Sequence, residues 1–237
     1  MSTHRTPSVA PDATLASVMW RGLEPFETTF AAMRAFTSTR NAHTPDQLWI
    51  VEHPPVFTLG LGADPAHILD ARQIPVVQTD RGGEVTYHGP GQAIVYILFD
   101  LRRQQGTRLL PREFVYQIEA AVITTLATYN LASERKPGAP GIYIADGAWQ
   151  GAKIAALGLK IRASGCTYHG VALNFAMDLA PFRQINPCGY AGLVTVDMQT
   201  LGATASLAEI QQTLANNLNF RLKGQAATLP ARQAMEN

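Results

Sequence analysis

Apolar side chains recur at helical spacing in three segments of the 237-residue chain, residues 25–40, 111–130 and 206–220. A proline opens each of the first two segments, and Ser206 with Glu209 has the spacing of a capping box at the start of the third. The three segments are therefore predicted to be amphipathic helices with one face toward a core. Their apolar stripes are Phe26, Phe30 and Met33; Phe114, Ile118, Val122 and Leu126; and Leu207, Ile210, Leu214 and Leu218.

Between these helices the pattern changes to short runs that are rich in β-branched and aromatic residues, and such runs predict strands. Strands are predicted at 47–53, 74–80, 93–101 and 166–177, with a hairpin over 141–161 that turns at Asp146–Gly147. Hairpins lie beside helices, and the strict strand–helix alternation of a parallel sheet does not occur. We therefore expect an α+β fold, in which a mixed β-sheet is flanked by helices in a single domain.

The two ends of the chain lack these patterns. Residues 1–20 are predicted to be a mobile N-terminal tail, residues 21–222 the folded domain and residues 223–237 a loose C-terminal tail. The first residues lack the apolar core of a signal peptide, and the longest apolar run, residues 93–99, is far too short to span a bilayer. We therefore expect neither a targeting segment nor a membrane partner.

Composition and charge narrow the class of partner. With 46% hydrophobic and 16% charged residues, the chain has the composition of a soluble globular protein. Its 19 basic and 18 acidic side chains give a net charge of +1, which supplies no field for nucleic acid or an anionic membrane. The two cysteines are too few for a disulfide framework, so we expect a cytoplasmic protein with both thiols reduced.

The sequence lacks the motifs of several common types of functional site. The chain has no phosphate-binding loop of the form G-x-x-x-x-G-K-[ST], and "GLG" at 60–62 is interpreted as a turn. No G-x-S-x-G sequence marks a serine hydrolase. Cys166 and His169 have C-x-x-H spacing, which His88 and Cys188 could complete as metal ligands, but a second paired motif is missing. Packing or hydrogen-bonded roles are therefore favoured over zinc.

The sequence "TYHG" occurs twice, at 86–89 and 167–170, each time next to a predicted strand. One interpretation is chance. The other is that two similar strand entries bring His88 and His169 to a common pocket.

Thiol chemistry remains, and it requires a choice between the two cysteines. Cys188, in "INPCGY", lies between Pro187 and Gly189, which favours a turn that exposes the sulfur, whereas Cys166 begins a strand, a common place for an inert thiol. A catalytic cysteine needs a nearby cation or base. Lys153, in the apolar stretch "GAKIAALG", is the candidate, although a lysine on the exposed face of a strand would show the same pattern. This chemistry names no substrate.

Six blocks of sequence together resemble the lipoyl(octanoyl) transferase family. They occur in order over residues 47–192, and the second and the last are the most specific. The blocks are "EHPPVFTLG" (52–60), "DRGGEVTYHGPGQAIVY" (80–96), "APGIYI" (139–144), "GAKIAALGLKI" (151–161), "GCTYHGVALNFAMDL" (165–179) and "INPCGYAG" (185–192). The chain departs locally from the family pattern at Glu84, Ala155 and Ala156, which occupy variable positions.

The resemblance implies the fold shared with biotin and lipoate protein ligases, and it assigns the site by position. It makes Cys188 the acyl-accepting nucleophile and Lys153 the residue that activates it, and it makes Cys166 a bystander. The segments implied to line the substrate site are Arg81, Gly82, Gly83, Glu84, Val85, Thr86, Tyr87 and His88; Ala156, Leu157 and Gly158; and Gly170, Val171 and Ala172. The small members of the last two segments are expected to leave an apolar slot for a C8 chain.

The implied reaction moves an octanoyl group from acyl carrier protein, through a thioester on Cys188, to a lysine of a lipoyl domain. The implied acceptors are the lipoyl domains of 2-oxoacid dehydrogenase complexes and the glycine cleavage H protein. We expect a monomer that needs no cofactor. Backbone N–H groups near Gly189 or in residues 156–158 are candidate oxyanion donors. Two alternatives remain open: an ATP-dependent lipoate or biotin ligase on the same fold, and a non-catalytic protein that binds an acyl carrier.

Overall fold

The computed structural model describes residues 15–102, 110–187, 190 and 192–223. Residues 1–14 of the predicted N-terminal tail, residues 224–237 and the candidate nucleophile Cys188 lie outside the described residues, as does Gly189.

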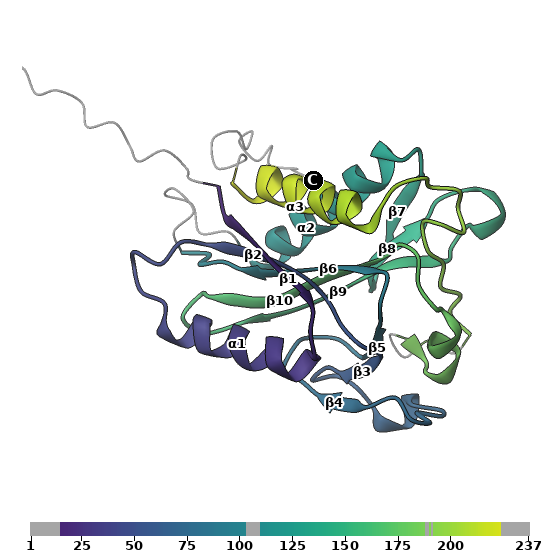
Figure 1. Ribbon diagram of the computed structural model, residues 1–237, viewed down its shortest axis with the longest axis horizontal. Helices are drawn as coiled ribbons and strands as arrows, with labels where there is room; N and C mark the ends of the chain where they lie inside the picture. The colour runs from purple at the N-terminus through teal and green to yellow at the C-terminus, as the bar shows by residue number, and fades with distance from the viewer. Residues whose placement is uncertain (1–14, 103–109, 188–189, 191, 224–237) are drawn as a thin grey trace, which may run out of the picture.

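A seven-stranded mixed sheet forms the centre of the molecule (Figure 1). Its strands are β1 (Ser17–Leu23), β2 (Gln47–Glu52), β6 (Gln92–Leu98), β7 (Ser133–Lys136), β8 (Ala139–Ile144), β9 (Lys153–Ile161) and β10 (Thr167–Asn174). They are arranged in the order β1-β2-β6-β10-β9-β8-β7. Only the β1–β2 pair in this sheet is parallel, and the other neighbours are antiparallel.

Helices cover both faces of this sheet, as Figure 1 shows. They are α1 (Phe26–Thr39), α2 (Pro111–Thr128) and α3 (Leu207–Lys223). Helices α2 and α3 pack on one face, and α1 packs on the other. Strand β6 explains why the chain has one long apolar run: Ala93, Val95 and Ile97 face the core under α2 and α3, whereas Ile94 and Tyr96 face the core under α1. A strand buried on both faces loses the alternation that a half-exposed strand has.

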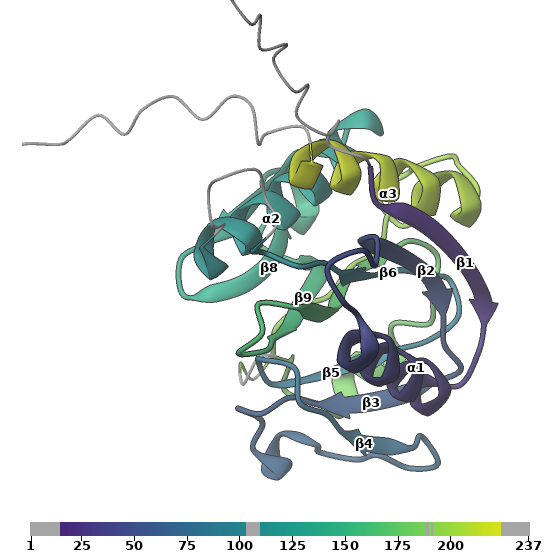
Figure 2. The same cartoon turned by 90° about the vertical axis from the view of Figure 1, so that its left-hand side faces the viewer.

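A second sheet, which the pattern did not distinguish from the first, contains β3 (Val56–Leu59), β4 (Val76–Gln78) and β5 (Val85–His88) in the order β4-β3-β5. Figure 2 shows it beside α1. Pro54 and Pro55 separate β2 from β3, and because proline has no N–H to donate, the chain leaves the main sheet there. This sheet brings β5 next to the main sheet.

The predicted helices are confirmed. Phe114, Ile118, Val122 and Leu126 are all buried in the core on one side of α2. The capping box also forms, because the Ser206 N–H donates to the Glu209 carboxylate at 2.7 Å and the Glu209 N–H donates back to Ser206 Oγ at 3.3 Å.

Three predicted boundaries differ from the structure. Residues 17–20, predicted to be part of the N-terminal tail, belong to β1, which lies parallel to β2 at the sheet edge. The predicted hairpin forms as β8 and β9, but a longer connection that contains a 3₁₀ turn at Gly147–Trp149 replaces the tight turn. Helix α3 extends to Lys223, one residue into the predicted C-terminal tail.

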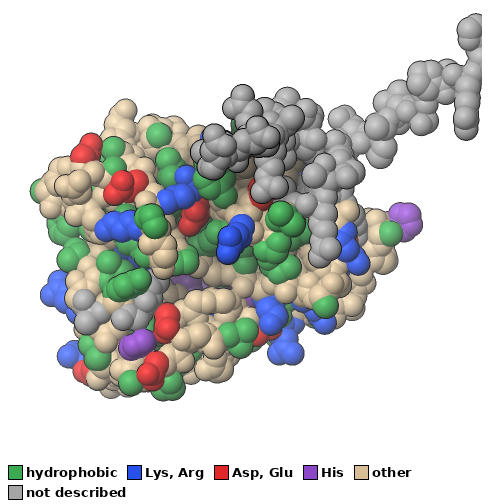
Figure 3. Space-filling model, turned by 180° about the vertical axis from the view of Figure 1, so that it is seen from behind, with side chains coloured by type: hydrophobic (Ala, Val, Ile, Leu, Met, Phe, Trp, Pro, Cys, Tyr) green, Lys and Arg blue, Asp and Glu red, His purple; other side chains and the backbone are tan. Residues whose placement is uncertain are grey.

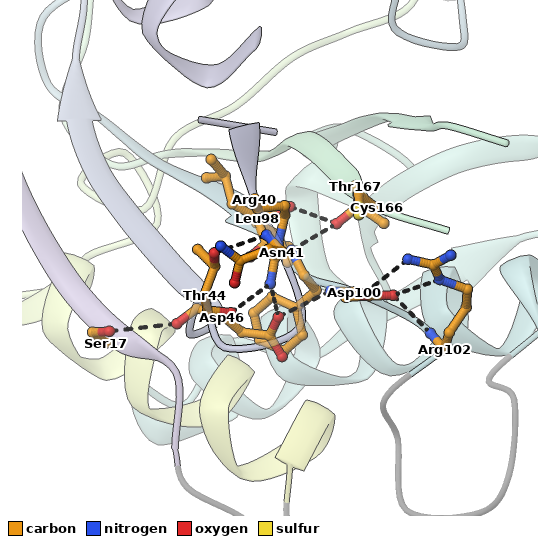
Figure 4. Close-up of polar contacts among 12 residues, drawn as sticks. Ser17, Arg40, Asn41, Thr44, Asp46, Leu98, Asp100, Arg102, Cys166 and Thr167 are labelled. Atoms are coloured by element: carbon orange, nitrogen blue, oxygen red, sulfur yellow. Dashed lines mark hydrogen bonds and ion pairs between the residues drawn. The ribbon is translucent and has the colours of Figure 1, made fainter. Parts of the chain in front are cut away.

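A buried charge cluster joins several of these elements at one end of the sheet (Figure 4). The Asp46 side chain, only 3% exposed, accepts hydrogen bonds from Arg40 Nη2 at 2.6 Å and from the Asp100 N–H at 2.9 Å. It also forms an ion pair with Lys223 at the end of α3. Arg40 in turn donates to the Leu98 carbonyl at 2.8 Å. The cluster therefore ties the ends of α1, β6 and α3 together.

On the face shown in Figure 3, both basic and acidic side chains are scattered over the surface, in keeping with the near-zero net charge. Among the residues that the structure describes, no helix combines the length and the apolar character needed to cross a bilayer.

Candidate active site

A cavity of about 460 Å³ opens beside β9 and β10, which is within the range of small-molecule sites. Its wall contains the residues that the sequence placed at the substrate site in all three segments, with one exception. Those that line it are Arg81, Gly82, Gly83, Glu84, Val85, Thr86 and His88; Ala156, Leu157 and Gly158; and Gly170, Val171 and Ala172. The antiparallel pairing of β9 and β10, which sets Gly158 opposite Gly170, brings the last two segments together.

The exception is Tyr87, which does not line this cavity. Its ring packs in the core of the small sheet, 5.7 Å from the Phe57 ring and 5.4 Å from the Phe182 ring. Successive side chains of a strand point to opposite faces, so the Tyr87 ring faces the core of the small sheet while its neighbour His88 lines the cavity.

Two of the small residues that line the cavity, Gly158 and Gly170, also lie in close contact with neighbouring parts of the protein. A β carbon added at Gly170 would lie 2.1 Å from the Val95 carbonyl oxygen, and one added at Gly158 would lie 3.0 Å from Arg81 Cδ. Close contact with β6 and with Arg81 therefore also favours glycine at these two positions. The small residues line the cavity, and the acyl slot stays a prediction.

Arg81 is buried, and its hydrogen bonds anchor the first residue of the cavity-lining segment 81–88. Its Nη2 donates to the Thr58 carbonyl at 2.6 Å and to Thr58 Oγ1 at 3.0 Å, and Nη1 donates to the Gly82 carbonyl at 3.1 Å. These contacts hold the guanidinium against β3 of the small sheet.

Lys153 lies at the first position of β9, where it is 4% exposed and lines the cavity. This position excludes the alternative of a lysine on the exposed face of a strand. Its Nζ donates to the Pro140 carbonyl at 2.9 Å and lies 5.6 Å from the centre of the Tyr143 ring. Residues on both sides of Cys188 in the sequence, Pro187 and Tyr190, line the same cavity.

Cys166 is buried, with a reduced thiol, immediately before β10. Its backbone forms an isolated antiparallel β-bridge with that of Asp100, next to the charge cluster of Figure 4. Cys166 is not among the residues that line the cavity.

The protonation of His88 follows from a chain of amide hydrogen bonds. The Val196 carbonyl can only accept, so the Asn174 group that contacts it at 3.1 Å must be the NH₂. Asn174 Oδ1 then accepts from Gln92 Nε2 at 2.9 Å, and Gln92 Oε1 lies 2.8 Å from His88 Nδ1. Because Oε1 is an acceptor, Nδ1 carries the proton. In the neutral ring, Nε2 is therefore the lone-pair nitrogen.

His169 lies on the same cavity wall as His88, as the repeated "TYHG" suggested. Its backbone has φ 60°, an uncommon left-handed conformation, and Tyr168 and His169 consequently both reach Asp80 instead of alternating. Tyr168 OH donates to Asp80 Oδ2, and His169 Nε2 donates to Asp80 Oδ1 at 3.1 Å. Burial raises the pKa of Asp80, but the hydrogen bonds from His169 and Tyr168 outweigh this and lower it to about 2.

Burial also acts on the histidines around the cavity. It lowers the pKa of His88 from 6.5 to about 3, with a smaller contribution from nearby His53, and it lowers the pKa of His53 and His169 as well. The unfolded chain therefore binds protons that the folded protein excludes at pH values between about 3 and 6.5.

Stability is accordingly expected to fall as pH drops below 6.5, by about 2 kcal/mol at pH 5 from His88 alone, since each pKa unit corresponds to about 1.4 kcal/mol. Urea unfolding between pH 5 and 7.5 measures this slope. The His88→Gln variant should have a shallower slope, whereas His43→Gln, at an exposed position, should keep the wild-type slope. An unchanged slope in His88→Gln would contradict the assignment.

Sequence reasoning missed several residues of this wall. Pro140 and Asn174 line the cavity, and so do Phe26 from α1 and Tyr96 from β6. The two aromatic residues have the pattern of core positions, and only the docking of α1 on the sheet brings them to the cavity. Among the residues that the structure describes, no group of three or more His, Cys, Asp and Glu side chains is arranged to hold a metal ion.

Comparisons with known proteins identify the family and the fold. Residues 25–219 match the model of a family described as the lipoyl protein ligase A/B catalytic domain. An octanoyltransferase of Janthinobacterium sp. (strain Marseille) is 69% identical over 206 residues, which cover 86% of this chain and 95% of that protein. A crystal structure of lipoate-protein ligase A bound with ATP has a TM-score of 0.71 at 14% identity, covering 88% and 86% of the two chains. Biotin protein ligase from Aquifex aeolicus has a TM-score of 0.52 at 9% identity, covering 90% and 71%. The expected ligase-like fold is thus confirmed.

Proposed function

The chain belongs to the lipoyl protein ligase A/B catalytic domain family and is an acyltransferase, and from this premise we propose that it carries octanoyl groups through a thioester on Cys188. The donor in this proposal is octanoyl-acyl carrier protein. The acceptor is a lysine of a lipoyl domain, such as those of the 2-oxoacid dehydrogenase complexes or the glycine cleavage H protein. Octanoyl transfer for protein lipoylation is the activity that the near relatives indicate.

The observation that carries the proposal is the placement of Lys153. Its nitrogen is buried and lines a cavity that Pro187 and Tyr190, on either side of Cys188 in the sequence, also line. An ammonium group beside a thiol stabilises the thiolate, which is the nucleophilic form. A ligase that activates its acid with ATP would not need Cys188.

The first step forms the acyl-enzyme. The Cys188 thiolate attacks the carbonyl carbon of the octanoyl thioester and gives a tetrahedral oxyanion. Collapse of this intermediate breaks the bond to the donor sulfur, and the departing thiolate takes a proton from the Lys153 ammonium. The products are Cys188 octanoyl thioester, the free thiol of the donor and a neutral Lys153 amine.

The second step transfers the octanoyl group. The amine of the acceptor lysine attacks the thioester carbonyl while neutral Lys153 takes up the proton that this amine loses. The C–S bond to Cys188 breaks, an amide forms, and the thiolate–ammonium pair is restored. Thioester to amide is downhill, so the step needs no nucleotide.

Intact mass of the protein tests the proposal. After incubation with octanoyl-acyl carrier protein without ATP, the wild type and Cys166→Ala are expected to gain one octanoyl group, mapped to Cys188 by peptide sequencing. Cys188→Ala should gain none. Addition of a lipoyl domain should then remove the group from the enzyme and place it on the lysine.

Different outcomes point to different functions. Labelling of Cys166, or equal labelling of Cys188→Ala, would overturn the assignment of the nucleophile. Transfer that requires Mg-ATP and survives in Cys188→Ala would identify a ligase. Binding of the carrier protein without any acyl-enzyme would identify a non-catalytic protein.

A further inference from the structure

Lys153, the first residue of β9, lies opposite the end of β8. The register of β8 and β9 pairs Tyr143 with Lys153, and the pairing shifts between Ile142 and Tyr143. The side chain of Lys153 turns back along β8, so that its Nζ donates to the Pro140 carbonyl at 2.9 Å.

The next residue along β8 is Gly141, and the Lys153 side chain occupies the space in which a side chain at position 141 would lie. A β carbon added at Gly141 would lie 2.6 Å from Lys153 Cε and 3.0 Å from Lys153 Nζ, and 2.6 Å from the Ala155 carbonyl oxygen. Contacts below 3.0 Å essentially never occur for real β carbons, so something would have to shift. Of these three atoms, the two of the lysine are the flexible ones.

The backbone of Gly141 has φ +125°, a conformation that L side chains rarely adopt. This conformation accompanies the register shift in β8 and sets the Pro140 carbonyl against the lysine nitrogen. Glycine at this position therefore does two things: it permits the backbone turn, and it leaves empty the volume into which the Lys153 side chain fits.

We propose that the Pro140 carbonyl and Gly141 form a socket that positions the Lys153 nitrogen for its work on Cys188. Gly141 is a positioning residue, since it touches the lysine and not the reacting atoms. The inference rests on the proposed function, because a socket for this nitrogen matters only if the nitrogen takes part in acyl transfer. Displacement of a catalytic group by about 1 Å can lower a rate by about a hundredfold, so a methyl group at Gly141 is sufficient to test the idea.

The experiment compares two glycine variants. Gly141→Ala places a methyl group in the socket. Gly147→Ala is the matched control, because Gly147 also has a positive φ of 72° but has no atom within 4 Å of the added β carbon. Both variants are made in a Cys166→Ala background, and alkylation of Cys188 by iodoacetamide is followed against pH together with the rate of acyl-enzyme formation.

If the socket positions Lys153, Gly141→Ala moves the pH midpoint of alkylation upward and slows acyl-enzyme formation by about tenfold or more, since one unit of midpoint is a factor of ten in thiolate. Gly147→Ala leaves both unchanged. Equal behaviour of the two variants, with an active wild type, would overturn the socket and keep the proposed function. A wild type that never forms an acyl-enzyme would instead overturn the proposed function.

A double-mutant cycle covers the case in which Gly141→Ala folds poorly. Lys153→Ala removes two of the three close atoms, so Gly141→Ala should lower the thermal stability of the wild type more than that of Lys153→Ala. Unfolding of Gly141→Ala alone, with recovery in the double variant, would support the socket. Equal loss of stability in both backgrounds would overturn it, because the cost would then come from the backbone and the Ala155 contact.

Discussion

Replacement of Lys153 by alanine is expected to lower the rate of octanoyl transfer by about 10²–10⁴-fold, the usual contribution of a positioned acid or base. Lys153 Nζ lies inside the cavity and has a fixed direction through its 2.9 Å hydrogen bond to Pro140. In the proposed mechanism it serves both half-reactions, so acylation of the enzyme and transfer to the lipoyl domain should both slow. Single-turnover measurements of each half-reaction test this directly.

Lys160→Ala is the matched control, because Lys160 belongs to the same strand but does not line the cavity. It should retain the rates of the wild type. A wild-type rate of acylation in Lys153→Ala would contradict the role of Lys153 in the first step. Loss of only the second half-reaction would restrict Lys153 to accepting the proton of the incoming amine.

Removal of the Asp46 carboxylate is expected to lower the free energy of unfolding by about 3–5 kcal/mol, the typical cost of leaving a buried partner unpaired. Arg40, whose side chain is 1% exposed, would lose its carboxylate partner, and the Asp100 N–H would lose its acceptor. Urea unfolding of Asp46→Ala measures the loss.

The control for this prediction is Asp70→Ala, which breaks the exposed ion pair between Asp70 and Arg72. Because both side chains of that pair are more than half exposed, little change in stability is expected. Comparable losses in the two variants would show that burial of the Asp46 cluster has no special energetic role.

Much of the fold could be predicted, because the spacing of apolar residues within a helix or strand shows which of its faces is buried. The stripe of Phe114, Ile118 and Val122 is visible in the spacing alone and lies in the core. Strand β1 could not be predicted in this way. Its side chains are mostly exposed at the sheet edge, so its apolar pattern is weak, and its position depends on backbone hydrogen bonds to β2, which any sequence can form.

The site was predictable as a set of segments but not in its orientation. Arg81, Lys153 and Gly170 were placed by resemblance, and the structure brings them to one cavity. The direction of individual side chains depends on register and on backbone conformation. Tyr87 faces away from the cavity, and His169 turns toward Asp80 through a positive φ that residue type does not reveal. Gly141 had no assigned role in the sequence, because the space that it leaves is explained only by the position of the Lys153 side chain.

The hydrogen-bond chain from Val196 through Asn174 and Gln92 to His88 determines which ring nitrogen of His88 carries the proton. Aspartate and glutamate have nearly the same outlines as asparagine and glutamine, but they lack the NH₂ that gives this chain its direction. Aspartate at position 174 would still accept from Gln92 Nε2, and glutamate at position 92 would still accept from His88 Nδ1–H, so the proton of His88 stays on Nδ1 after either change. Only reversal of the Gln92 amide, with its NH₂ toward His88, would place the proton on Nε2, and the carbonyl of Val196 at the far end of the chain opposes that reversal through Asn174. The two arrangements would look the same in electron density at ordinary resolution, so the tautomer is assigned from the acceptor at the end of the chain.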